Sequence, residues 1–126
     1  MIKGFKNAVE LDFSVEENRL KMEEAFRQVE AEKGKVYPLI IGGEKIETEK
    51  KITSLSPATK EVLGYASSCS RELADKAIQT ADEAFLTWSR TPAEERIRCL
   101  KRLARLVEQN RFILDAWNVE ESGKNW

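Results

Sequence analysis

The sequence predicts an α/β chain in which helices lie before and after a group of short strands. Apolar residues recur at helical spacing in the stretches 14–34, 70–90 and 91–123. Between the first two of these, residues 37–67 are rich in strand-forming residues interrupted by turn signals. The 126 residues are the size of one ordinary domain, which buries roughly two-thirds of its unfolded surface if it folds alone.

Composition argues against several classes of partner. The chain carries 21 basic and 22 acidic residues, a net charge of −1, and the charges are interspersed with apolar residues. This pattern is not typical of a nucleic-acid-binding polycation. Charged residues follow Met1–Phe5, and no apolar run reaches the roughly 20 residues that a membrane helix needs. We therefore expect no nucleic-acid partner, no membrane partner and a cytoplasmic location.

The first helix is predicted from Ser14 to near Gly34. Ser14-Val15-Glu16-Glu17 is typical of a capping box. One apolar stripe consists of Met22, Ala25, Phe26 and Val29. Favourable ion pairs four residues apart are Glu17 with Lys21 and Glu23 with Arg27. We expect a mostly solvated N-terminal arm.

Two hairpins are predicted next. Tyr37–Ile41 is a short strand-like run, and Gly42-Gly43 supplies the positive φ angles of a tight turn into Glu44–Ile46. A phosphate-binding loop would need more glycines and a following helix, so the hairpin is favoured. The second hairpin joins Lys51–Leu55 to Val62–Ser67 through a turn at 56–60.

The second helix is predicted from Ser70, its N-cap, to about Arg90. Its broad apolar face consists of Leu73, Ala74, Ala77, Ile78, Ala81, Ala84, Phe85 and Trp88. Small residues let another backbone approach closely, so this face should lie flat against a helix or a sheet.

The last helical stretch has recognisable signals at both ends. Thr91 is the expected N-cap, followed by Pro92 in the first turn and by Glu94 three residues after the cap. A break is expected near Asn110, and Gly123 should end the helix in a left-handed conformation. The apolar positions are Ile97, Leu100, Leu103, Ala104 and Val107, then Phe112, Ile113, Ala116 and Trp117.

Candidate catalytic groups are few. There is no histidine, the commonest general base and zinc ligand. Cys69 and Cys99 lack metal-site spacing and a partner base, so we interpret them as reduced packing thiols of ordinary reactivity. Gly123-Lys124 lacks the other residues of a Walker A loop and is better explained as a helix end. The basic residues of the last helices indicate a solvated, ion-paired face: Arg96, Arg98, Lys101, Arg102, Arg105 and Arg111.

The succession of segments resembles the N-terminal part of the aldehyde dehydrogenase superfamily. The segments that carry the resemblance are Ser56–Val62, Ala81, Ala84-Phe85, Trp88, Thr91–Arg96, Leu103-Ala104 and Glu121–Lys124. The superfamily usually has Asn at the position of Ser56 and Gly at that of Lys60, two departures that affect the geometry of one turn. The 1-pyrroline-5-carboxylate dehydrogenase branch is the most similar, through Phe5–Asn7, Tyr37–Glu44 and Gly123–Trp126.

The resemblance implies NAD-dependent oxidation of an aldehyde, in this branch of L-glutamate γ-semialdehyde to L-glutamate in proline degradation. In the superfamily a cysteine thiolate attacks the carbonyl, hydride passes to the nicotinamide, and a glutamate helps water hydrolyse the thioester. Those groups lie beyond the stretch that this chain resembles. We therefore expect no catalytic, cofactor-binding or metal-binding residue here, NAD only in the full-length parent, and no activity from this fragment alone.

The resemblance also divides the chain and suggests its partner. Residues 1–36 correspond to an N-terminal arm with a helix, and residues 37–126 to an incomplete first part of the NAD-binding domain, without its Rossmann-type parallel sheet. We expect the apolar helix faces to bind the remainder of the aldehyde dehydrogenase chain or a second copy. The alternative is a self-sufficient, non-catalytic helical interaction module.

Overall fold

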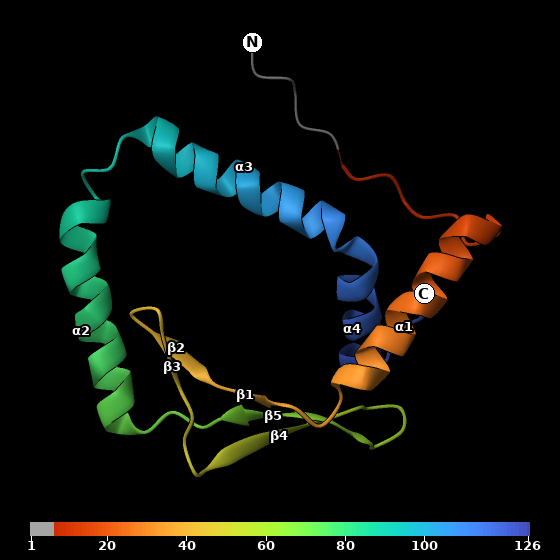
Figure 1. The fold of residues 1–126 in the computed structure, drawn as a ribbon, viewed down its shortest axis with the longest axis horizontal. Helices are drawn as coiled ribbons and strands as arrows, with labels where there is room; N and C mark the ends of the chain where they lie inside the picture. Colours follow the sequence, from red (N-terminus) through yellow and green to blue (C-terminus); the bar gives the residue numbers. More distant parts are fainter. Residues whose placement is uncertain (1–6) are drawn as a thin grey trace.

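The computed structural model describes residues 7–126, which form helices and short strands in the predicted order (Figure 1). The predictions that involve Met1–Phe5 and Lys6 lie outside the described residues. The elements are α1 (Glu16–Glu32), β1 (Val36–Tyr37), β2 (Leu39–Ile41), β3 (Glu44–Ile46), β4 (Lys51–Leu55), β5 (Val62–Ser67), α2 (Arg71–Trp88), α3 (Ala93–Gln109) and α4 (Arg111–Ser122).

Both predicted hairpins are confirmed, except that Tyr37, predicted at the start of the first strand, belongs to β1. β2 pairs antiparallel with β3, and Gly42 and Gly43 between them have φ angles of 60° and 86°. β4 pairs antiparallel with β5, with Lys51 opposite Ser67. The sequence did not reveal β1, which pairs in parallel with β5 and makes it the central strand of a three-stranded sheet. Pro38 separates β1 from β2, because a proline has no N–H to donate to a continuous ladder.

The main buried cluster lies between α1 and α4. Met22, Ala25 and Val29 of α1 and Ala116 of α4 are at most 3% exposed. Aromatic and branched side chains pack around them: Phe13, Phe26, Phe112, Ile113, Trp117 and Val119. The predicted stripe on α1 is therefore correct, and α4, from a distant part of the sequence, covers it. Ten of the 17 residues of α1 remain exposed, which agrees with the expectation of a mostly solvated arm.

The ion pairs of α1 differ in part from the prediction. Lys21 Nζ lies 2.6 Å from Glu17 Oε1, as expected. Glu23 pairs with Arg19 at 2.7 Å instead of with Arg27, which reaches Glu24 at 2.7 Å. Each arginine on this helix can reach more than one glutamate, so spacing alone did not select the partner.

Two of the predicted N-caps are also wrong. α1 has Val15 at its N-cap position, and Ser14 instead donates from N and Oγ to Asp12 Oδ1, at 2.8 and 2.7 Å. α3 has Pro92 at its N-cap position, and Thr91 Oγ1 donates to the Thr87 carbonyl of the preceding helix. A serine or threonine hydroxyl near the start of a helix can bond to a nearby residue instead of capping the helix, and both hydroxyls do so here.

The other predicted helix ends are confirmed. The Ser70 side chain accepts a hydrogen bond from the Leu73 amide and caps α2. Asn110 separates α3 from α4 as predicted. Gly123 ends α4 with φ 63° in the left-handed region.

The α2 and α3 helices lie apart from the buried cluster. Figure 1 shows them as a long arch that leaves the sheet at α2 and returns to α1 through α4. Neither helix has a buried residue. α2 contacts β2, where Thr80 lies close to Gly42, and α3 contacts α4.

Candidate functional site

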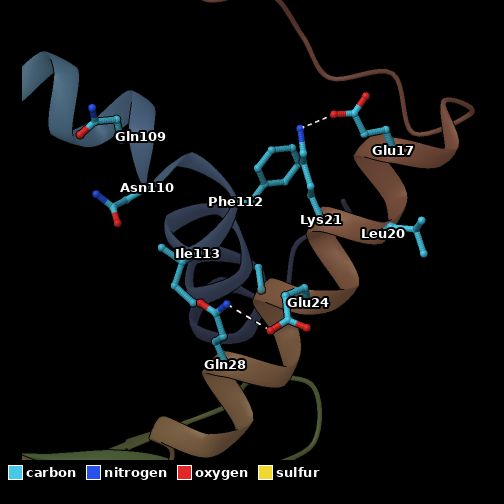
Figure 2. A pocket seen from close by; sticks show the side chains of 10 residues that line it. Glu17, Leu20, Lys21, Glu24, Gln28, Gln109, Asn110, Phe112 and Ile113 are labelled. Atoms are coloured by element: carbon cyan, nitrogen blue, oxygen red, sulfur yellow. Dashed lines mark hydrogen bonds and ion pairs between the residues drawn. The ribbon is translucent and has the colours of Figure 1, made fainter.

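A groove of 420 Å³ lies between α1 and the start of α4 (Figure 2). Ala25, Phe112 and Ile113 contribute its apolar lining. Figure 2 shows Lys21 extended between Phe112 and Glu17, with its Nζ 5.9 Å from the centre of the phenyl ring. The groove thus combines an apolar lining with charged groups that already bind each other.

The carboxylates of this groove are poorly suited to acid or base catalysis. The hydrogen bond from Lys21 lowers the pKa of Glu17, and hydrogen bonds from Arg27 and Gln28 lower the pKa of Glu24. Both groups are therefore ionised at neutral pH, whereas a general acid or base needs a pKa near the working pH. We find no catalytic arrangement in the groove.

The two cysteines do not line this groove. Cys69 and Cys99 are unpaired, and both are exposed, so their interpretation as packing thiols is wrong. Cys69 Sγ lies 3.4 Å from the Ser70 carbonyl oxygen, which accepts its hydrogen bond. Within residues 7–126, no group of three or more metal-ligating side chains comes together. Ordinary thiol reactivity stays a prediction.

The first turns of α1, α2 and α3 are poorly suited to hold the pyrophosphate of NAD. A pyrophosphate is commonly held by the free amides and positive dipole end of a helix N-terminus. The first turns of α1, α2 and α3 carry carboxylates, namely Glu16 and Glu17, Glu72, and Glu94 and Glu95. These negative charges repel phosphate, so we assign no cofactor contact to them.

The most prominent feature is a set of exposed apolar side chains, which we call the α2–α3 surface. Its members are between 45% and 70% exposed: Ile78, Phe85, Leu86 and Trp88 of α2, with Ile97, Leu100, Leu103, Leu106 and Val107 of α3. A hollow of 380 Å³ at the corner brings Trp88 together with Ile97 and Leu100. An exposed apolar group of this size indicates a surface that binds another protein segment.

Lys33 forms ion pairs with three parts of the chain: α1, the turn before β5 and α4. Its Nζ lies 2.7 Å from Glu30 of α1, 3.7 Å from Glu61 beside β5 and 3.5 Å from Glu120 of α4. The hydrogen bond with Glu30, helped by the charges of Glu120 and Glu61, raises the pKa of Lys33. Lys33 therefore stabilises the junction of α1, α4 and the sheet.

No helix among the described residues has the length and apolar content needed to cross a bilayer.

Comparison with known proteins identifies this arrangement. A curated 1-pyrroline-5-carboxylate dehydrogenase of Geobacillus thermodenitrificans is 48% identical over 127 residues, which cover 100% of this chain and 25% of that protein. The crystal structure of a 1-pyrroline-5-carboxylate dehydrogenase from Thermus with bound NAD superposes with a TM-score of 0.95 and 39% identity, over 99% of this chain and 24% of the other. Proline utilization A of Bdellovibrio bacteriovorus superposes with a TM-score of 0.94 and 30% identity, over 98% of this chain and 13% of the other.

These matches confirm the predicted fold, a mixed α/β segment that corresponds to the N-terminal quarter of 1-pyrroline-5-carboxylate dehydrogenase structures. The chain spans 25% of the length of the curated relative from Geobacillus. The model of the aldehyde dehydrogenase family matches residues 45–126. The chain therefore belongs to the aldehyde dehydrogenase family.

Proposed function

We propose that this chain is the first part of an NAD-dependent enzyme that oxidises L-glutamate γ-semialdehyde to L-glutamate in proline degradation. In this proposal residues 1–36 are an N-terminal arm and residues 37–126 begin the NAD-binding domain. The chemistry, the cofactor site and the substrate site belong to the part of such an enzyme outside this chain. A cytoplasmic location stays a prediction.

The uncovered α2–α3 surface is the observation that carries the proposal. The chain adopts an arrangement that superposes on the Thermus enzyme with a TM-score of 0.95, and yet α2 and α3 have no buried residue in it. Two amphipathic helices with uncovered apolar faces are expected when a further part of the protein packs on those faces. The role of this segment is then structural: it positions helices against the domain that binds the cofactor.

A chimeric enzyme tests the proposal. This chain would replace the matching first quarter of the Geobacillus thermodenitrificans relative, and NAD reduction with L-glutamate γ-semialdehyde would be followed by absorbance. We expect turnover within about tenfold of the intact relative, and no turnover from the 126-residue chain alone. A soluble, folded chimera without turnover would contradict the proposal.

A second chimera tests the branch. The structure of HpcC from Thermus thermophilus superposes with a TM-score of only 0.67 over 81% of this chain. Joined to the remainder of that protein, the chain should give a poorly soluble or inactive product, because the superposition leaves about a fifth of this chain without a counterpart. Equal activity in both chimeras would show that the segment carries no branch-specific fit.

A further inference from the structure

We propose that the α2–α3 surface can bind the remainder of such an enzyme as a separate polypeptide, without a peptide bond after Trp126. The inference rests on the proposed function and extends it from a covalent segment to an assembly in trans. The partner that we propose is the part of a 1-pyrroline-5-carboxylate dehydrogenase that follows the stretch matched by this chain.

Trp126 contacts two aromatic side chains of this chain, although it is itself 51% exposed. Its ring stacks on Phe26 of α1 with 5.3 Å between the ring centres and meets Phe13 edge-on at 5.5 Å. These contacts involve α1 and the segment before it, and they lie outside the α2–α3 surface. A break in the backbone after Trp126 therefore leaves the binding surface uninterrupted.

The α2–α3 surface is presented by an arch that is anchored at both ends. α2 begins directly after β5, contacts the β2–β3 hairpin and pairs Lys76 with Glu44 at 3.5 Å. α3 leads into α4, which is packed on α1 around the buried Ala116. Both ends of the arch are thus anchored in the part of the chain that has its own core (Figure 1), so a partner meets helices held in place.

The charge of Arg96 favours this partner over a second copy of the chain. Arg96 lines the same corner hollow as Trp88, Ile97 and Leu100. A two-fold pairing centred on this hollow brings two Arg96 guanidinium groups close together, which is unfavourable. A longer partner has no such symmetry and can place an acceptor opposite Arg96. The share of the relatives outside the match, with 25% of the Geobacillus protein covered, supplies such a partner.

The test is expression of this chain, with an affinity tag, together with the complementary segment of the Geobacillus thermodenitrificans relative from a second gene. We expect the two polypeptides to purify together in equal amounts and to reduce NAD with L-glutamate γ-semialdehyde. Leu100→Glu, in the centre of the α3 stripe, should lower the yield of the complex at least tenfold. Arg102→Glu is the matched control on the opposite face of the same helix and should change the yield less than twofold.

The covalent chimera described above distinguishes the two proposals. An active chimera with no complex and no activity from the separate polypeptides overturns the inference and leaves the proposed function intact. A soluble, folded chimera without turnover means that the proposed function itself fails. A homodimer of this chain that excludes the second polypeptide, or equal effects of Leu100→Glu and Arg102→Glu, also overturns the inference.

Discussion

Two helix pairs in this chain have similar apolar patterns and opposite burial. α1 and α4 cover each other, and Met22, Ala25, Val29 and Ala116 are almost inaccessible. α3 has the same length as α1, 17 residues, and carries a longer apolar stripe, but none of its residues is buried. The comparison teaches that an apolar stripe predicts that a helix will be covered, without saying whether the covering element lies in the same chain.

The difference also predicts where the stability of the free chain resides. Most helical stability comes from tertiary packing of an apolar face and little of it from intrinsic propensity. The apolar faces of α1 and α4 pack on each other, whereas those of α2 and α3 are packed only when a partner binds. Substitutions in the two regions should therefore have unequal effects on the unfolding of the free chain.

The largest expected effect separates Met22→Ala from Leu100→Ala. Met22 is 1% exposed, so its truncation should lower the free energy of unfolding by about 2–5 kcal/mol. Leu100 is 66% exposed, and its truncation should change that free energy by less than about 0.5 kcal/mol. Urea titration followed by circular dichroism measures both. Equal losses would mean that the α2–α3 surface is already covered in the free chain.

Gly123→Ala should cause the next largest loss in the free energy of unfolding. Gly123 has φ 63°, and an added Cβ would lie 3.1 Å from Pro57 Cγ of the β4–β5 turn. The left-handed conformation alone costs an alanine roughly 1–2 kcal/mol, and displacement of Pro57 adds to this. Gly34→Ala is the control, because Gly34 has φ 78° but open space around it. If both variants unfold at the same urea concentration, the contact between α4 and the turn does not matter for stability.

Lys60→Gly should change the free energy of unfolding by less, and should raise it instead of lowering it. Lys60 has φ 65°, a conformation that glycine adopts without strain. The substitution should raise the free energy of unfolding by about 0.5–1 kcal/mol, after the greater freedom of glycine in the unfolded chain is counted. Ala58→Gly in the same turn should lower it instead, as thermal unfolding of the two variants will show. Destabilisation by Lys60→Gly would rule out strain at this position.

Lys33→Met should have the smallest effect on the free energy of unfolding, a few tenths to about 1 kcal/mol at neutral pH. Two of the three carboxylates around Lys33, those of Glu30 and Glu61, are largely exposed, which weakens their ion pairs. The pKa of Lys33 is raised in the folded state, so its contribution is complete below the ordinary lysine pKa of about 10.4 and is lost as pH rises through the folded value.

The difference in urea midpoint between the natural chain and Lys33→Met should therefore shrink above this pH. Lys35→Met is the control, since Lys35 is half exposed and pairs only within its own segment, with Glu32. A difference that stays constant into the alkaline range would show that Lys33 acts through the packing of its methylene groups.

Much of the local structure was predictable because it depends on neighbouring residues. The hairpin at Gly42-Gly43, the cap at Ser70 and the break at Asn110 each follow from chemistry within a few residues. The departure at Lys60, where the superfamily usually has glycine, indicated an altered turn, and the structure places that residue in the left-handed region.

The errors have two physical causes. Ser14 and Thr91 were expected to cap helices, but their hydroxyls donate to Asp12 and to the Thr87 carbonyl, nearby partners between which the capping pattern does not choose. The parallel pairing of β1 with β5 joins residues almost thirty positions apart, as in Val36 with Tyr65, and has no local signature. The candidate site was predictable only as apolar faces, because their exposure depends on what else packs nearby.

The sequence by itself determined the α/β class, the order of the helices and of the two hairpins, the left-handed end of α4 at Gly123, and membership of the aldehyde dehydrogenase family. Only the tertiary structure decided that α1 contributes to the core and that α2 and α3 do not. Periodicity and capping act over one or two turns of a helix, whereas burial requires a complementary surface to arrive from a distant part of the sequence. For α1 that surface is α4, in the same chain, and among residues 7–126 the exposed side chains of α2 and α3 have no comparable cover.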